Sequence, residues 1–144
     1  MTILYKELPA PELLEVHGVW GLEPGFYKIE PEVKPKPEDQ ILRVNTTYCM
    51  WYMNDVLHHE KRPSVEYADG GFMWYLYGKK HRMGGPAIKT DICYEWFHHG
   101  VRHRADGPAI EWADGDKAWY RHGGLLSEKS IEELKAELSN RKGG

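Results

Sequence analysis

The sequence lacks the features that would place it in several common classes of protein. It has only two cysteines, and no apolar run approaches the roughly 20 residues of a transmembrane helix. Its 19 basic and 22 acidic side chains give a net charge of −3, which argues against binding to a nucleic-acid backbone. No secretory signal opens the chain, so we expect a cytoplasmic protein without a membrane partner.

Motifs for catalysis and cofactor binding are also lacking. The sequence contains no G-x-S-x-G elbow, no P-loop and no dinucleotide fingerprint, so we expect a protein that is not an enzyme and needs no cofactor. Cys49 and Cys93 match no metal or redox spacing. Two free thiols are the favoured interpretation, and a disulfide is the alternative.

Large aromatic residues are abundant and recur at a fixed period. Six tryptophans and nine tyrosines against three phenylalanines favour a β-rich fold. Successive members of the set Trp51, Trp74, Trp96 and Trp119 are 23, 22 and 23 residues apart. Aligned on them, the chain reads W-Y-x-x-G-x-x-H-R-x-x-G-P-A-I-x-x-x-D-G in about three and a half copies. We name each repeat by its tryptophan and count places from that residue.

The repeat predicts antiparallel hairpins. Asp69-Gly70 and Asp114-Gly115 are typical of two-residue type I′ turns, which would pair Val65 with Trp74 and Ile110 with Trp119. The middle hairpin lacks Asp-Gly and is one residue shorter, so we expect an altered turn or a bulge there. The predicted fold is mainly β: a meander of 22–23-residue hairpin repeats followed by a short C-terminal α-helix.

Alternation along these strands predicts two different sheet faces. The face expected to form the core carries the four repeat tryptophans with Val65, Tyr67, Ile88, Ile110 and Trp112. The opposite face carries an aromatic ladder among charges, a composition suited to contact with a partner. The residues predicted to bind there are Tyr52, Tyr75, Phe97, Tyr120, Arg82 and Arg104.

The flanks of the repeats do not repeat. We predict three segments: residues 1–50 cover or cap the sheet, residues 51–126 form the repeats, and residues 127–144 form a capping helix and tail. Ser127 is expected to cap a helix that ends near Arg141, with Leu126 stapled to Ile131. Packing of this helix on the last repeat is favoured over a partner-binding role. The terminal Gly-Gly carries no argument for a ubiquitin-like function, because the array is not a ubiquitin fold.

The histidines allow a structural and a chemical interpretation. The structural one is favoured: a histidine before each Gly-Pro-Ala corner holds the bend through the turn backbone. The predicted corner residues are His58, His81, His103, Pro63, Pro86 and Pro108. Protonation should then lower stability between about pH 7 and pH 5. The first corner, HHEKRPSV, keeps histidine and proline but lacks the arginine of place 8, as expected if charge matters less than the bend.

A metal site is the weaker alternative for these histidines. Equivalent residues of adjacent repeats lie two strands apart, roughly 9–10 Å, which is too far for a shared metal among His58, His81 and His103. His99 and His122 could share a row with His98 nearby, but strand alternation predicts that His98 points away from His99.

The motif W-x-x-G-x-x-H with a following D-G resembles the MORN repeat over about residues 51–124. The resemblance implies an elongated antiparallel sheet with two strands per repeat that serves as a scaffold or binding surface. The H-R-x-D-G-P-A variant is similar to that of small phage-encoded proteins. The Tyr-x-Gly before the family's tryptophan and the Gly-x-Gly after its histidine are missing, so the lipid binding proposed for MORN arrays does not carry over.

Two functions follow as hypotheses. The first is a non-catalytic protein-binding module, which the resemblance suggests could be a phage-encoded inhibitor of a host defence or regulatory protein. The alternative is sequestration of a nucleotide-like ligand between two protomers by stacked aromatics with Arg82, Arg104, Lys79 and Lys80. Open sheet edges are often protected by pairing, so a homodimer is compatible with either hypothesis.

Overall fold

A computed structural model describes residues 5–7, 22–28 and 40–142 of the chain. Its contacts divide the chain into two units, Met1–Lys79 and Lys80–Gly144, and each is described by itself. The structure is mainly antiparallel β with one C-terminal helix, which confirms the predicted fold class. No helix in the described ranges is long and apolar enough to cross a membrane. The predicted three-segment division stays a prediction.

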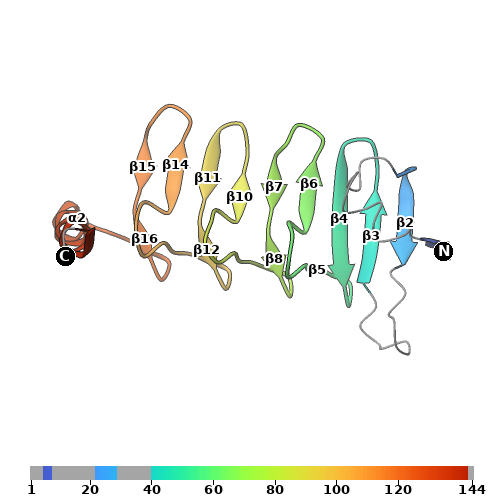
Figure 1. Ribbon diagram of the computed structural model, residues 1–144, viewed down its shortest axis with the longest axis horizontal. Helices are drawn as coiled ribbons and strands as arrows, with labels where there is room; N and C mark the ends of the chain where they lie inside the picture. The colour runs from blue at the N-terminus through green and yellow to red at the C-terminus, as the bar shows by residue number, and fades with distance from the viewer. Residues whose placement is uncertain (1–4, 8–21, 29–39, 143–144) are drawn as a thin grey trace. The chain divides into compact units, whose positions relative to one another are not determined.

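The Trp51, Trp74 and Trp96 repeats each contain a long hairpin and a short hairpin, and the truncated Trp119 repeat contains a short one (Figure 1). The long hairpins pair β6 (Val65–Tyr67) with β7 (Phe72–Met73), β10 (Ile88–Lys89) with β11 (Cys93–Glu95), and β14 (Ile110–Trp112) with β15 (Lys117–Ala118). The short ones pair the end of β4 (Tyr48–Met53) with β5 (Val56–Leu57), β12 (Phe97–His98) with β13 (Val101–Arg102), and β16 (Tyr120–Arg121) with β17 (Gly124–Leu125). β8 (Tyr75–Leu76) and β9 (Lys79–Lys80) lie at the boundary of the two units.

The repeat tryptophan stands where the chain passes from one hairpin to the other, and its main chain ties the two together. The Trp51 N–H donates to the Ser64 carbonyl at 2.8 Å, and the Trp51 carbonyl accepts from the His58 N–H at 3.0 Å. In the Trp96 repeat the N–H donates to Ala109 at 2.8 Å and the carbonyl accepts from His103 at 3.1 Å. The strand is interrupted at Trp74, Trp96 and Trp119, and side-chain alternation starts again after them. β4 runs through Trp51 and changes its partner there from β6 to β5.

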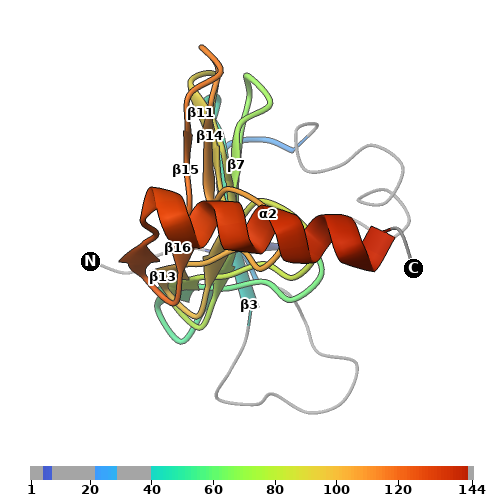
Figure 2. The same ribbon diagram turned by 90° about the vertical axis from the view of Figure 1, so that its left-hand side faces the viewer.

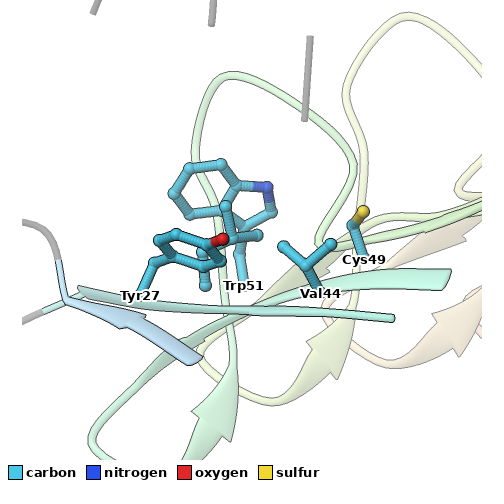
Figure 3. Packing of buried hydrophobic residues seen from close by; sticks show 5 residues of the cluster. Tyr27, Val44, Cys49 and Trp51 are labelled. Carbon is cyan, nitrogen blue, oxygen red and sulfur yellow. The ribbon is translucent and has the colours of Figure 1, made fainter. Parts of the chain in front are cut away.

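The first unit contains the main apolar cluster. β1 (Tyr5–Glu7) runs parallel to β2 (Gly25–Lys28), and β2, β3 (Gln40–Val44) and β4 are antiparallel neighbours. Cross-strand partners share a face, so the pairing of Leu42 with Trp51 and of Val44 with Cys49 concentrates apolar side chains on one side. Figure 3 shows Tyr27, Val44, Cys49 and Trp51 grouped there, each at most 4% exposed. Whether residues 8–21 and 29–39 cover the sheet lies outside the described residues.

The type I′ turns predicted at Asp-Gly are wrong, because the observed strand pairing is shifted by one residue. Ile110 pairs with Ala118 and Val65 pairs with Met73, so each loop has three residues rather than two. The Gly115 N–H donates to the Trp112 carbonyl at 3.0 Å and Gly115 has φ 96°, the pattern of a type I turn that ends in a glycine bulge. The Tyr67–Gly71 loop repeats this arrangement, with Gly70 at φ 94°.

The middle long hairpin has the altered turn that its shorter sequence predicts. Ile88 pairs with Glu95 and Lys89 with Tyr94, which leaves a two-residue loop at Asp91 and Ile92. The Thr90 side-chain oxygen accepts the N–H groups of Ile92 and Cys93 at 3.2 and 3.1 Å. A two-residue loop instead of three accounts for the missing residue of this repeat.

Type I′ turns occur in the short hairpins instead. Both central residues have positive φ at each of four sites: Asn54-Asp55, Tyr77-Gly78, His99-Gly100 and His122-Gly123. These are places 3 and 4 of the repeat, so the glycine of the W-Y-x-x-G motif is the second central residue of a type I′ turn.

The predicted core face is confirmed for Trp51, Val65, Ile88 and Ile110, which are at most 5% exposed. It is wrong for Trp112, which is 38% exposed at the end of β14. The other three repeat tryptophans are half-buried. The predictions assumed one unbroken strand on each side of the turn, whereas the chain changes hairpin at every tryptophan.

The C-terminal helix α2 (Glu128–Lys142) begins after Ser127, as predicted. The Ser127 hydroxyl accepts the Ser130 N–H at 3.2 Å, which caps the helix. Leu134 is 5% exposed, and the Lys135 ammonium lies 5.7 Å from the Trp119 ring centre. Figure 2 shows α2 crossing the end of the second unit beside β16. The helix thus packs on the last repeat.

Candidate functional site

The three repeat histidines each hold a turn of the following repeat. Their Nδ1 atoms accept main-chain N–H groups: His58 from Tyr77 at 2.8 Å, His81 from His99 at 2.9 Å, and His103 from His122 at 3.0 Å. The two rings of each pair are in contact, with centres 4.2, 4.3 and 4.4 Å apart; the His81–His99 and His103–His122 rings are stacked, and the His58–Tyr77 rings are tilted. We call this pairing the histidine–turn joint. Each histidine thus holds the type I′ turn of the next repeat, and the prediction that it holds the neighbouring Gly-Pro corner is wrong.

A second hydrogen bond completes each joint. The glycine N–H of the same turn donates to a carbonyl of the preceding repeat at 2.8 Å, from Gly78 to Leu57, Gly100 to Lys80 and Gly123 to Arg102. The joint therefore satisfies two consecutive N–H groups of a turn whose first residue, such as His99 at φ 47°, is held in the left-handed region.

The joint fixes the protonation of its histidine. An Nδ1 atom that accepts an N–H carries no proton, so the ring is neutral with its proton on Nε2. Burial lowers the pKa of His58, His81 and His103, and neighbouring histidines lower it further for the last two. Burial next to Arg62 also lowers the pKa of His59, to about 4. All four rings are therefore neutral at pH 7.

The predicted binding arginines brace the corners. Arg82 and Arg104 donate to the carbonyls of Pro86 and Pro108, both at 3.1 Å. The Arg104 guanidinium also lies 3.9 Å from the Trp96 ring centre and donates to Asp106 and Glu111 at 3.1 and 3.0 Å. Its charge is thus balanced by two carboxylates. Pro63 is half-buried at the first corner.

The aromatic ladder is largely occupied by contacts within the chain. Phe97 is 7% exposed, with the Lys80 ammonium 5.0 Å and the Arg102 guanidinium 5.6 Å from its ring centre. Arg102 also lies 5.6 Å from the Tyr120 ring centre. Tyr52 and Tyr75 are half-buried, and their hydroxyl groups point to the sulfur atoms of Met50 and Met73. These side chains stabilise the short hairpins and offer little free surface.

Five histidines gather in the second unit, where sequence reasoning expected them apart. His98 and His99 have ring centres 4.4 Å apart, so the prediction that they point to opposite faces is wrong. Strand alternation does not apply because His99 belongs to the type I′ turn. His81 lies 4.7 Å from His98, and His103 lies 6.0 Å from it, measured between ring centres. The x-Gly pair at places 3 and 4 is the signal that could have revealed the turn.

A groove of about 550 Å³ lies beside this cluster. Its lining includes both corner arginines, Arg82 and Arg104, with Trp96, His98, His103 and His122. The groove combines ring faces with guanidinium and imidazole N–H donors, which suit a flat anionic ligand, but it also holds the Asp106 carboxylate that pairs with Arg104.

Exposed apolar side chains gather at the far end of the long hairpins. Ile92 is 63%, Tyr94 41% and Trp112 38% exposed. Tyr94 and Trp112 line a hollow of about 400 Å³ together with Lys89 and Glu111, and the Ala113 N–H donates to the Ile92 carbonyl at 2.9 Å. Trp112 pairs with Cys93 and Tyr94 pairs with Glu111, so the two aromatic side chains flank this hairpin end from opposite faces of the sheet. We call Ile92, Tyr94 and Trp112 together the hairpin-end surface, which a partner would have to grip from both faces. Sequence reasoning placed Trp112 in the core and so missed it.

The two cysteines offer no chemistry here. Cys49 and Cys93 are both buried free thiols. Burial, with Glu66 nearby, raises the pKa of Cys49 to about 12, which keeps it protonated and unreactive.

Comparison of the chain with known protein families, curated proteins and solved structures gives no match.

Proposed function

We propose that the chain is a non-catalytic protein-binding module that engages its partner through the hairpin-end surface. The observation that carries the proposal is the exposure of Ile92, Tyr94 and Trp112 at adjoining hairpin ends. Tyrosine and tryptophan are enriched among the residues that dominate binding energy, and charged residues commonly rim such sites. Lys89, Asp91 and Glu111 supply that rim.

The resemblance to small phage-encoded MORN-like proteins suggests the class of partner. A host defence or regulatory protein is the partner that we propose, with inhibition as the consequence of binding. The structural contacts of the repeat histidines and corner arginines support a non-catalytic role.

Capture from bacterial lysate with the full chain as bait tests the proposal. We expect a specific protein to be retained by the unaltered chain and lost with the double variant Tyr94→Ala, Trp112→Ala. The matched control is Met83→Ala, because Met83 is 73% exposed but lies away from this surface. Retention of nothing at several salt concentrations, or equal retention by the double variant, would contradict the proposal.

A second candidate function is favoured by the groove beside the histidine cluster. Arg82, Arg104 and Trp96 could hold a nucleotide-like anion by charge and stacking. A thermal-shift screen of nucleotides and cyclic dinucleotides tests this candidate. A flat response across the panel at ligand concentrations well above micromolar would exclude it.

A further inference from the structure

Three imidazoles meet where the Trp74 and Trp96 repeats join within the second unit. One coordinating nitrogen from each of His81, His98 and His99 lies within 4.8 Å of the other two. His98 is half-buried on β12, His81 is half-buried before the corner, and His99 is exposed in the turn. The group consists of histidines alone and therefore offers neutral nitrogen ligands.

The fold accounts for two of these three histidines but not for the third. His81 and His99 form a histidine–turn joint, which every repeat builds in the same way. His98 occupies place 2, which is Leu76 in the Trp74 repeat and Arg121 in the Trp119 repeat. Both of those repeats form the same short hairpin and turn without a histidine there. The folding of the repeat thus does not require His98.

We infer that His81, His98 and His99 form a binding site for a divalent transition metal of the zinc, nickel or copper type. Imidazole nitrogens suit these metals, whereas calcium and magnesium require oxygen ligands. Three protein ligands leave one position of a tetrahedral site for water or another ligand.

Closure of the site needs only small movements. Bonds of about 2.0–2.1 Å to a tetrahedral zinc ion place ligand nitrogens about 3.4 Å apart, compared with the present limit of 4.8 Å. The rings of His81 and His99 are stacked, so their in-plane lone pairs converge only after one ring turns. His99 is the ring that can turn, because it is exposed.

Metal binding and the histidine–turn joint compete for one atom. The Nδ1 lone pair of His81 accepts the His99 N–H, and its Nε2 carries the proton. A metal can take Nδ1 directly, or it can take Nε2 while the Nε2 proton is replaced by one on Nδ1. In both cases Nδ1 no longer accepts the His99 N–H, which becomes solvated because the turn lies at the surface. Binding at this site should loosen the turn of the Trp96 repeat and leave the joint at His103 intact.

Equilibrium dialysis of the full chain, without a histidine tag, against Zn²⁺ tests the inference. We expect one equivalent of zinc to bind to the unaltered chain, with Cu²⁺ bound more tightly. His98→Leu copies Leu76 and should keep the fold, but should weaken zinc binding by about tenfold or more, the least that loss of a supporting group usually costs. The control His122→Tyr copies Tyr77 and should leave binding unchanged.

Amide hydrogen exchange supplies the second measurement. Zinc should speed exchange of the His99 N–H but not that of the His122 N–H, because only the first competes with the metal. Less than a tenth of an equivalent of bound zinc would overturn the inference, as would equal binding by His98→Leu with an unchanged melting temperature. Equal exchange at both amides would overturn the participation of His81 in the metal site.

Discussion

The Trp51 and Trp96 repeats use the same side chain in different surroundings. Trp51 is 3% exposed within the apolar cluster of the first unit, and it contacts His59 edge-on at 4.9 Å between ring centres. Trp96 is only half-buried, and its main covering contact is the Arg104 guanidinium. The repeat tolerates this difference in burial because the tryptophan main chain makes the same hydrogen bonds in both.

The arginine contact is kept although its position in the sequence changes. Arg62 lies 5.3 Å from the Trp51 ring centre and pairs with Glu66 at 2.9 Å. Arg104 lies over Trp96 and pairs with Glu111 at 3.0 Å, and both glutamates occupy place 15. In the Trp51 repeat the arginine over the tryptophan is therefore at place 11, whereas in the Trp96 repeat it is at place 8. The expectation that this corner dispenses with the charge is wrong.

The largest loss of stability should follow removal of the buried tryptophan of the first repeat. Trp51→Ala should lower the free energy of unfolding by about 3–5 kcal/mol, because it empties a buried site. Trp112→Ala, at a position that is 38% exposed, should cost less than about 1 kcal/mol. Urea unfolding followed by circular dichroism measures both. Similar losses for the two variants would show that Trp51 does not anchor the first unit.

The histidine–turn joints should differ in strength for the same reason. His58→Ala should cost about 2–3 kcal/mol, because His58 is 1% exposed and its loss leaves both a cavity and the Tyr77 N–H unpaired. His103→Ala should cost about 1 kcal/mol, since water can reach the His122 N–H. His58→Asn supplies an oxygen near the position of Nδ1 and should recover part of the loss. No recovery would argue against the hydrogen bond as the source of stability.

Lowering the pH should weaken the histidine–turn joints by protonating their imidazole rings, with no change of sequence. The pKa values of His58, His59, His81 and His103 are lowered in the folded chain, so below about pH 6.5 the unfolded chain binds more protons. The free energy of unfolding should therefore be fully present above pH 6.5 and fall towards pH 4, where His59 also titrates. Thermal melts at pH 7.5, 6 and 5 measure the trend. A constant melting temperature would refute the assignment of neutral rings.

The smallest effect concerns place 4 of the repeat, which is the second central residue of each type I′ turn. Asp55 holds φ 61° where the other three repeats have glycine. Asp55→Gly should stabilise the chain by a few tenths of a kcal/mol to about 1 kcal/mol, as relief of left-handed strain outweighs the added freedom of the unfolded chain. The reverse change, Gly100→Asp, should destabilise it by a similar amount. Urea midpoints that move together in one direction would contradict this account.

The sequence predicts the period, the hairpins and the helix, because each depends on local spacing. It cannot choose between the two turns compatible with Asp-Gly, since glycine has positive φ in both the two-residue and the three-residue loop. The extra residue shifts the partner of Ile110 from Trp119 to Ala118. Trp112 stays on the face of Ile110, but it lies at the end of β14 and is 38% exposed, so alternation alone does not predict its burial.

The candidate site is less predictable than the fold because its contacts join neighbouring repeats. His81 bonds the main chain of His99, and no spacing rule within one repeat reveals that bond. The expectation that His98 and His99 diverge depends on a continuous strand, and it fails where the strand ends in a turn. Recognition of Tyr77-Gly78, His99-Gly100 and His122-Gly123 as equivalent turns would have placed these histidines together.

The histidine–turn joint has a consequence for how such a chain can change length. Each joint links residues only 18 or 19 positions apart, and each repeat brings one histidine for its successor and one turn for its predecessor. A duplicated repeat would therefore arrive with both halves of the connection already matched to its neighbours. Arrays of this kind can lengthen or shorten by whole repeats, while substitutions such as His98 give one copy a property that the others lack.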